Sequence, residues 1–572
     1  MADRGGEPFA APGGSAGERR VRGLRSALAP RPPRVAPSAS RVTSRAMSAV
    51  SKGPRAGARA GGDPAGGQLR RRHLVRRPAW RLPESREDRL AVIGLAALLV
   101  VGALLRLLFV FAWRPALFGW PDAASYIEVS QGAGGAPLGN AELFGNPLRP
   151  AGYPLFLRVL HGIAPSLLFV VVLQHLLGLA SAALLYLTVA RTGVPRPLGL
   201  VPAAVVALGG DIMFVEHAPI SEALFIFLVA SGLYAAVRSQ EGEHLRWPAI
   251  CGLAFALAAT VRVVAVPLLV VVGLWLLVGT NLPLRRRLTV LAVGAAGALG
   301  LLGTYYAIQE SAVGRTGLSP NGIWNLYGRV APFADCSKFT PPAGTEMLCE
   351  TTPRSQRPFT HLYTFNWYYS PGVRIFGNPH TASAEQTDQV AGFTWAVIAG
   401  QPLDYAEEVG AGLLRYIAPE SFRGYGGGPS YHDLVHKVLF HRRFQREGLG
   451  VARRHYADAG GFSADHRLIE VLRTYESATR IQGPLFVLIA LLSVIAPFLT
   501  RGHARGAALL FALAGWTLLV TPVATVEFSA RTGLPGFGPL CAAAALGGWR
   551  VLAAVRGRKR RSGAGGPLAE PV

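Results

Sequence analysis

One carboxylate stands directly after the first long apolar segment of the chain. Asp122 lies in the stretch WPDAASYIEVS, residues 120–130, where it precedes Ser125 and Tyr126. An ionisable group at the edge of a membrane segment costs free energy, and it is a functional candidate for that reason. A carboxylate there can take a proton from a substrate hydroxyl as a general base. The spacing also fits a helix cap or a first-turn acid, with Tyr126 one turn further along the same face and Glu128 directed elsewhere.

Three arginines stand at the predicted outer edges of apolar segments. Arg149 begins the stretch RPAGYP, whose Tyr153 brings an aromatic ring back towards the membrane surface, and Arg262 and Arg531 lie beside other apolar segments. A guanidinium is planar and permanently charged, so it suits a phosphate or a carboxylate. The alternative for each arginine is contact with lipid headgroups. We therefore take the three as candidate anion ligands.

A second acid, Glu222, opens the fourth apolar segment. It could bind substrate hydroxyls or pair with Arg262, and the alternative is a helix-start carboxylate stabilised by the helix dipole. Glu216 and His217, in the preceding turn, are expected to be solvated. His175, in the middle of the second apolar segment, is expected to be a hydrogen-bonded packing group between helices.

Composition places the chain among membrane proteins. Half of its 572 residues are hydrophobic, only 16% are charged, and the apolar residues fall in long blocks. The formal net charge of +25 could suggest nucleic acid, but no recognition motif accompanies it. The basic residues gather in the N-terminal tail, in short connections and at the C-terminus, which is typical of a charge distribution that orients a membrane protein. We therefore expect no nucleic-acid partner.

Ten apolar segments are each close to the length that crosses the hydrocarbon core of a bilayer. They lie near 90–112, 165–190, 197–212, 219–237, 247–263, 265–280, 288–308, 483–500, 505–522 and 533–554. With the N-terminal tail inside the cell, every short cytoplasmic connection is rich in arginine, as the positive-inside rule requires. The sequence therefore predicts a multi-pass protein of the cell membrane with both termini cytoplasmic.

The remaining segments divide the chain further. Residues 1–88 are expected to be a disordered basic tail, in which Met47 is an alternative start. Residues 89–308 form an N-terminal transmembrane module whose first outer loop is 113–164. Residues 309–482 are expected to be an extracytoplasmic loop subdomain between spans 7 and 8, 483–555 the last spans, and 556–572 a basic cytoplasmic tail.

Four cysteines are present. Cys251 and Cys541 lie in apolar segments and are expected to be packing residues. Cys336 and Cys349 are close together in the long outer segment, where a disulfide is plausible if the segment is extracytoplasmic. Their spacing is not that of a zinc site, because no second ligand pair accompanies them.

Several stretches together resemble a known family. These are DAASY and RPAGYP in the first outer loop, SEALFIFLVASGLY (221–234), AATVRVVAVPLL (258–269) and VEFSARTGLPGFGPL (526–540). They are similar to motifs of the polyprenyl-phosphate-sugar-dependent glycosyltransferases of the GT-C fold, which include the protein O-mannosyltransferases and the lipid A aminoarabinose transferases. The stretches LYGRVAPFADC and WYYSPGVRIFG resemble actinobacterial members of this group. The resemblance covers roughly residues 90–555.

The resemblance implies an all-α polytopic membrane protein, a GT-C-like bundle of about ten transmembrane helices with a large extracytoplasmic loop subdomain. It implies transfer of a hexosyl or pentosyl group, such as mannose, from a polyprenyl-phosphate donor to an extracytoplasmic protein, glycan or glycolipid acceptor, with inversion. By the same resemblance Asp122 is the catalytic base, and Tyr126, Tyr153 and Glu222 bind substrate. The donor phosphate would be bound by Arg262, Arg531 and Arg149. No obligatory cofactor or metal is expected, although a divalent metal stays possible, and the remaining partner is membrane lipid.

Two departures from the family pattern leave alternatives open. The family often has Asp-Glu where this chain has Asp122-Ala123, and Pro-Pro where it has Pro150-Ala151. A catalytically silent family member, acting as an assembly partner, is therefore one alternative. A transporter or flippase for a lipid-linked sugar is another, and it predicts internal repeats and ionisable groups near the bilayer midplane, which the sequence does not display.

Overall fold

The computed structural model describes residues 85–563, apart from gaps at 133–142, 147–148, 242–243, 315–316, 320, 358–369, 378, 380 and 419–441. The predicted tail before residue 85, the last nine residues of the chain and part of the long outer segment lie outside this range. The helix α1 begins at Arg86, inside the region expected to be tail, because Ser85 caps it by accepting a hydrogen bond from the Asp88 backbone N–H at 3.0 Å.

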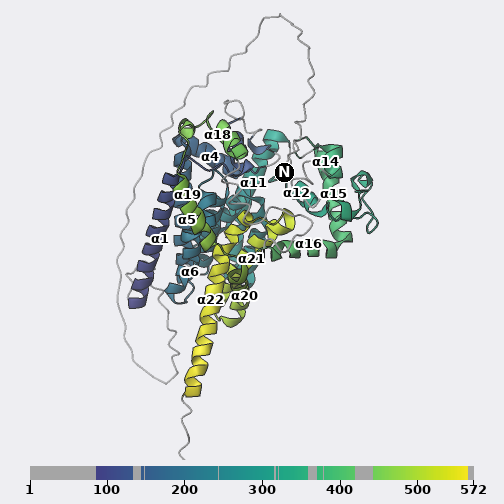
Figure 1. Ribbon diagram of the computed structural model, residues 1–572. Coiled ribbons are helices and arrows are strands. Elements are labelled where there is room, and N and C mark those ends of the chain that lie inside the picture. The colour runs from purple at the N-terminus through teal and green to yellow at the C-terminus, as the bar shows by residue number, and fades with distance from the viewer. Residues whose placement is uncertain are drawn as a thin grey trace, which may run out of the picture. The chain divides into compact units, whose positions relative to one another are not determined.

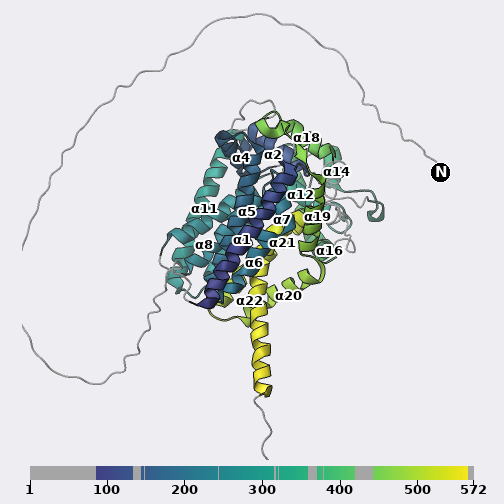
Figure 2. The same ribbon diagram turned by 60° about the vertical axis from the view of Figure 1, so that its left-hand side comes forward.

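Within the described ranges, six helices are long and apolar enough to cross a membrane. They are α1 (Arg86–Ala112), α5 (Leu167–Ala190), α8 (Glu222–Ser239), α11 (Leu284–Val313), α21 (His503–Thr525) and α22 (Ala530–Gly563). In Figures 1 and 2, the C-terminal part of α22, in yellow, extends below the other helices. The helix α22 continues past residue 555, where the sequence predicts the start of the C-terminal tail.

Two further candidate spans are bent. The first joins η1 (Arg196–Gly199) and α6 (Leu200–Leu208) to α7 (Gly210–Glu216) with a bend of 50°, and the second joins α19 (His466–Thr479) to α20 (Gly483–Leu499) with a bend of 45°. The short apolar helices α9 (Arg246–Val261) and η2–α10 (Val263–Val278) stay below the length of a span. All ten predicted apolar segments are thus helical, whereas the described residues support six to eight crossings, and ten are not confirmed.

Glycines let some of these helices pack backbone against backbone. A Cβ on Gly252 of α9 would lie 1.9 Å from the carbonyl oxygen of Gly294 on α11, and one on Gly536 of α22 would lie 2.9 Å from that of Gly515 on α21. Small residues at helix contacts are the usual means of close packing in a membrane, where burial of apolar side chains supplies little driving force. The last two helices therefore form a tight pair that carries Arg531.

The remaining elements are short. They are α2 (Pro121–Gln131), α4 (Gly152–Ile163), α12 (Asn321–Val330), η3 (Glu346–Leu348), η4 (Arg354–Gln356), α14 (Pro371–Phe376), α15 (Ala384–Gly400), α16 (Pro402–Leu414), α18 (Arg442–Ala452) and η6 (Ala457–Gly460). Two two-residue strands, β1 (Trp113–Arg114) and β2 (Ser463–Ala464), pair antiparallel with Trp113 opposite Ala464. This pair of strands departs from the all-α expectation.

The described residues of the outer segment, 309–482, contribute to two cores. A small core of its own gathers Trp324, Tyr327, Phe393 and their neighbours. Residues 442–482 contact the main bundle: β2 pairs with β1, directly after α1, α18 packs on α2, and α19 packs on α7. The return of these residues to α1 and α2 places them around the first outer loop.

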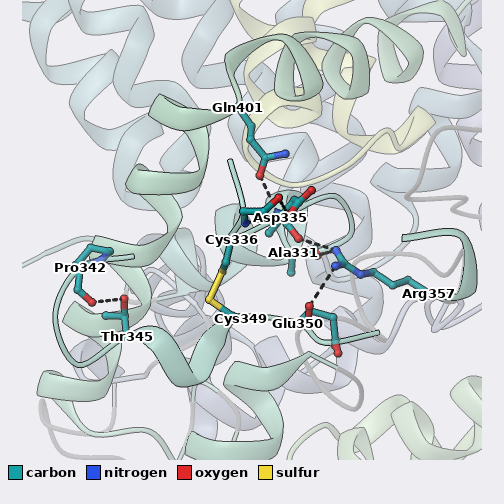
Figure 3. The surroundings of a disulfide bond; sticks show 11 residues. Ala331, Asp335, Cys336, Pro342, Thr345, Cys349, Glu350, Arg357 and Gln401 are labelled. Atoms are coloured by element: carbon teal, nitrogen blue, oxygen red, sulfur yellow. Dashed lines mark hydrogen bonds between the residues drawn. A yellow bond between two sulfur atoms is a disulfide. The ribbon is translucent and has the colours of Figure 1, made fainter. Parts of the chain in front are cut away.

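A disulfide joins Cys336 to Cys349 in the small core (Figure 3). Beside it, the guanidinium of Arg357 donates hydrogen bonds to the carbonyl oxygens of Ala331, Pro332 and Ala334 at 2.9–3.2 Å. The side-chain carbonyl of Gln401 accepts from the Asp335 backbone N–H at 2.8 Å. The turn after α12 is therefore held by one covalent bond and by side chains that satisfy its backbone groups.

Candidate active site

The helix α2 positions Asp122. Pro121 stands at its first position, where the missing N–H costs nothing, and Asp122 follows in the first turn, where the helix dipole favours an acid. Ala123 and Ile127 on the opposite side are fully buried, so the helix has a fixed packing face. Gly132 ends it with a φ of 94°, which is accessible to glycine at no steric cost.

Two arginines hold the Asp122 carboxylate, one on each oxygen. The Nη2 of Arg149, which precedes α4, donates to Asp122 Oδ1, and the Nη2 of Arg531 on α22 donates to Oδ2 at 2.5 Å. Contact with lipid headgroups is the alternative for Arg149, but in the structure its guanidinium contacts Asp122. Its backbone N–H donates to Asn146 Oδ1 at 2.9 Å. The candidate base is therefore clamped by two cations.

The electrostatic balance at Asp122 favours the ionised form. Burial by itself raises the pKa of this carboxyl, but attraction and hydrogen bonds from Arg149 and Arg531 outweigh burial and hold the pKa well below its usual range. Asp122 is consequently a carboxylate at every physiological pH. A carboxylate stabilised in this way is a weak base as long as both arginines stay in place.

The second carboxylate shares one of these arginines. Glu222 at the start of α8 accepts from Arg262 Nη1 at 2.5 Å, and its Oε1 lies 3.1 Å from Arg531 Nε. Arg531 therefore bridges Asp122 and Glu222. Three guanidiniums surround two carboxylates, which gives the cluster a formal charge of 3 − 2 = +1. A positive excess in a half-buried site favours an anionic ligand.

The two predicted tyrosines occupy different depths. The Tyr126 hydroxyl donates to Ser221 Oγ at 3.2 Å, and the Arg149 guanidinium lies 5.0 Å from the Tyr126 ring centre. Tyr153 is fully buried behind Tyr126, and its hydroxyl donates to the Gln174 side chain at 2.7 Å. Tyr126 therefore belongs to the cluster, whereas Tyr153 supports it from behind.

The structure adds one residue that the sequence did not single out. The ring centre of Trp120 lies 5.6 Å from the Arg531 guanidinium, a cation–π distance. The available signal was its position two residues before Asp122. By itself, an aromatic ring at the membrane edge is typical of an interfacial anchor.

Several polar atoms of the cluster are buried without a hydrogen-bond partner among the described residues. They are Trp120 Nε1, Arg149 Nε, Arg531 Nη1 and Glu222 Oε2. A buried polar atom left unpaired costs about 1–3 kcal/mol, so such atoms are normally satisfied by a ligand or by water. Three of the four are donors, which suits an oxygen-rich ligand. No group of three His, Cys, Asp or Glu side chains within the described ranges could hold a metal ion.

Glu216 and His217, expected to be solvated, are instead buried completely. His175 contacts both of them, in keeping with its expected role as a hydrogen-bonded packing group. Their carboxylate and rings lie inside the bundle because α7 turns inward at the break after Gly209. The polar residues and Pro219 in this turn predict exposure to solvent, so the burial of Glu216 and His217 could not be predicted from the sequence.

Comparison with known proteins gives only distant likenesses. No protein-family model and no curated protein matches the chain. Among solved structures, the Pmt1–Pmt2 protein O-mannosyltransferase complex of S. cerevisiae, bound to the sugar donor, aligns at 15% identity and a TM-score of 0.30, covering 38% of this chain and 33% of that chain. The oligosaccharyltransferase AglB from Archaeoglobus fulgidus, in complex with an inhibitory peptide and a dolichol-phosphate, aligns at 10% identity and a TM-score of 0.36, covering 85% of this chain and 53% of that one.

The apo form of an A. fulgidus oligosaccharyltransferase aligns at 12% identity and a TM-score of 0.38, covering 84% of this chain and 53% of that one. The chain thus spans about a third to about half of the length of these proteins. At such scores the likeness carries no assignment of chemistry, which has to come from the side chains themselves.

Proposed function

We propose that this multi-pass membrane protein is a glycosyltransferase of the GT-C type, which moves a sugar from a polyprenyl phosphate to an acceptor outside the cytoplasmic membrane. The observation that supports this most is the cluster around Asp122, in which three arginines face two carboxylates. A phosphate needs cations, and an acceptor hydroxyl needs a base, and this cluster offers both within one set of contacts. The sequence motifs of the first outer loop agree with that chemistry.

The reaction would be a single displacement. The acceptor hydroxyl loses its proton to Asp122, and its oxygen forms a bond to the anomeric carbon of the sugar. The bond between that carbon and the phosphate oxygen breaks, and its electron pair stays on the departing polyprenyl phosphate. Arg149, Arg262 and Arg531 stabilise the charge on the phosphate, which needs no general acid. Attack from the side opposite the phosphate inverts the anomeric centre.

Donor binding would also switch on the base. In the absence of donor, Arg149 and Arg531 hold both oxygens of Asp122 and make it a poor proton acceptor. A phosphate bound to the same guanidiniums competes for their N–H groups and weakens their hold on Asp122. The carboxylate then regains basicity only when a sugar donor is present, which limits unproductive chemistry.

The orientation of the protein follows from its charge. With the arginine-rich connections in the cytoplasm, Asp122, Arg262 and Arg531 lie at the outer face of the cell membrane. The donor would be a polyprenyl-phosphate hexose or pentose, such as mannose or arabinose, and the acceptor an extracytoplasmic protein, glycan or glycolipid. The helix α18 of the outer segment packs on α2, which carries Asp122. We expect the acceptor to approach Asp122 from the side of this segment.

Sugar transfer in reconstituted vesicles tests the proposal. Labelled polyprenyl-phosphate mannose and arabinose are supplied to the wild type, to Asp122→Asn and to Glu128→Gln, at matched protein levels. Glu128 is the control because it lies on the same helix, is exposed, and pairs only with Arg454 among the described residues. We expect transfer by the wild type and by Glu128→Gln, and a loss of about 10²-fold or more in Asp122→Asn, the usual scale of a general base.

Donor binding, measured separately, should survive in Asp122→Asn because the arginines remain. Equal transfer by Asp122→Asn and the wild type would remove Asp122 from the chemistry. No transfer from either donor, with donor binding intact, would favour the catalytically silent alternative.

A further inference from the structure

A second polar cluster lies inside the bundle, outside the candidate active site. It consists of Arg106 on α1, His175 on α5, Glu216 at the end of α7 and His217 directly after it. None of the four residues is more than 4% exposed. Gly178 makes room for the acid, since a Cβ there would lie 1.8 Å from Glu216 Oε1. Burial of ionisable groups inside a membrane bundle costs free energy, so such groups are functional candidates.

The four side chains form one chain of contacts. Arg106 Nε and Nη2 donate to Glu216 Oε2 at 2.8 Å and to Oε1 at 2.9 Å. His175 Nδ1 lies 2.9 Å from Glu216 Oε2, and His175 Nε2 lies 3.0 Å from His217 Nδ1. His217 Nε2 lies 2.9 Å from the carbonyl oxygen of Trp113. The chain therefore runs from a carboxylate through two imidazole rings to a backbone carbonyl.

Hydrogen bonds at all three contacts of this chain require one proton more than its neutral parts supply. The Trp113 carbonyl can only accept, so His217 Nε2 must carry a hydrogen. The contact between the two rings needs a second hydrogen, and the contact between His175 and Glu216 needs a third. Two neutral imidazoles bring only two N–H groups, and an ionised carboxylate brings none. Every arrangement that satisfies all three contacts contains one additional proton.

The extra proton belongs to the His175–Glu216 end. Burial first, and the neighbouring His175 second, hold the pKa of His217 well below its usual range, so His217 stays neutral. If the extra proton leaves, two lone pairs must face each other, either at the 2.9 Å contact between His175 Nδ1 and Glu216 or at the 3.0 Å contact between the two rings, and that contact becomes repulsive. The chain is therefore complete while the proton is held, and it opens as the pH rises.

His217 connects this chain to the candidate active site. Its ring holds the Trp113 carbonyl, and its own backbone carbonyl accepts from the Leu117 N–H at 2.9 Å. Both ends of the 113–117 connection, which leads from α1 to α2, are thus held by one residue. The Phe109 ring stacks on His217 with centres 4.1 Å apart and fixes its plane. Asp122 follows on α2.

We infer that the chain Arg106–Glu216–His175–His217 is a proton-dependent positioning element, which holds the 113–117 connection, and with it Asp122, only while the additional proton is present. Other charged or titratable groups on the surrounding elements have their own partners: Tyr475 donates to the Leu208 carbonyl, Glu476 pairs with Arg480, Arg480 lies 3.9 Å from Asp211, and Glu222 pairs with Arg262 and Arg531. The link of this positioning element to catalysis rests on the proposed function, whereas the contacts that form the element do not depend on it.

Hydrogen exchange at the Leu117 amide reports whether the positioning element holds the 113–117 connection, and it needs no substrate. The purified full chain in lipid nanodiscs is compared at several values between about pH 5 and about pH 8, the range in which histidine-containing pairs titrate. Protection factors, corrected for intrinsic exchange, are followed for peptides that contain the Leu117 amide. In the wild type we expect protection to fall by about tenfold or more as the pH rises, since one pKa unit corresponds to a factor of ten.

Glu216→Gln is the decisive variant. An amide in place of the acid supplies its own N–H to His175 Nδ1, so the three contacts are complete without a titratable proton. Protection at Leu117 should then be independent of pH. Glu241→Gln is the matched control: Glu241 pairs with Arg191 and Arg238 just beyond the other end of α8, and its removal should leave the pH dependence as in the wild type.

The single variant leaves Arg106 without its counter-charge, which can prevent folding. The double variant Arg106→Gln/Glu216→Gln removes both charges and keeps the amide, and it should also show protection that does not depend on pH. Protection in the wild type that is constant over the whole range would overturn the inference, as would the same fall in both amide variants. Because no sugar is transferred in this measurement, failure here is separate from failure of the proposed function.

Discussion

Arg531 donates a hydrogen bond to Asp122, a residue 409 positions earlier in the chain, and places its Nε 3.1 Å from Glu222. One guanidinium therefore joins α2, α8 and α22. Because α22 is fixed by close glycine contacts with α21, the position of Arg531 depends on the packing of the last two helices. The candidate active site exists only when the first outer loop and the end of the chain are folded together.

This bridging geometry predicts that lysine cannot replace arginine at position 531. Lysine keeps the charge but lacks the planar fork that serves two carboxylates at once. A charge-assisted hydrogen bond contributes about 1.5–3 kcal/mol, so Arg531→Lys should lower kcat/KM for sugar transfer by about 10–100-fold. The control is Arg550→Lys, on the same helix, where the side chain donates to the Leu499 carbonyl and lies 5.4 Å from the Trp549 ring centre but meets no carboxylate in the described contacts. Equal losses in both variants would mean that the bridge has no special role.

The clamp on Asp122 also predicts how stability responds to pH. Arg149 and Arg531 lower the folded-state pKa of Asp122 below its unfolded value. The stabilisation is therefore fully present above the unfolded pKa, about 3.9, and it is lost as the pH falls through the still lower folded pKa. In the Glu216→Gln background, where the 113–117 connection should not respond to pH, the difference in thermal stability between the protein with Asp122 and the one with Asp122→Asn should stay constant between about pH 5 and about pH 8. A difference that shrinks steadily over that range would contradict the double clamp.

The sequence located the components of this cluster and offered the pair of Glu222 with Arg262, which the structure contains, but it did not indicate the partners of Asp122. Asp122, Glu222, Arg262 and Arg531 each stand at the edge of an apolar segment, which marks them individually. Which arginine meets which acid depends on the packing of helices far apart in the chain, and no local pattern carries that information. For the same reason the sequence left contact with lipid headgroups open as the alternative for Arg149.

The helical segments were predictable because long apolar runs have few alternatives in a bilayer. The break at Gly209 was not, since glycine is common within membrane helices and only tertiary packing decides where a helix bends. The same break carries Glu216 and His217 into the interior. The return of residues 442–482 to α1 and α2 rests on strand pairing and helix contacts over hundreds of residues, which hydropathy does not encode.

Gly152 offers a test of how strictly the cluster depends on packing around Arg149. It begins α4 three residues after Arg149, and a Cβ there would lie 2.6 Å from both the carbonyl oxygen and the Oγ1 of Thr260 on α9. Backbone cannot give way as a flexible side chain can, so Gly152→Ala should push α4 away from α9. Overpacking of this kind typically costs about 1–3 kcal/mol.

Gly162 is the matched control, because it lies in the same helix and a Cβ there would meet nothing within 4 Å. Gly162→Ala should be neutral or stabilising by up to about 1 kcal/mol, the helix preference of alanine over glycine. Thermal unfolding in nanodiscs measures the first effect, and donor binding measures whether Arg149 has moved. A Gly152→Ala protein that melts lower but binds donor normally would show that α4 can shift without disturbing the arginine. Weaker donor binding in Gly152→Ala alone would mean that contact between α4 and α9 sets the position of Arg149 against Asp122.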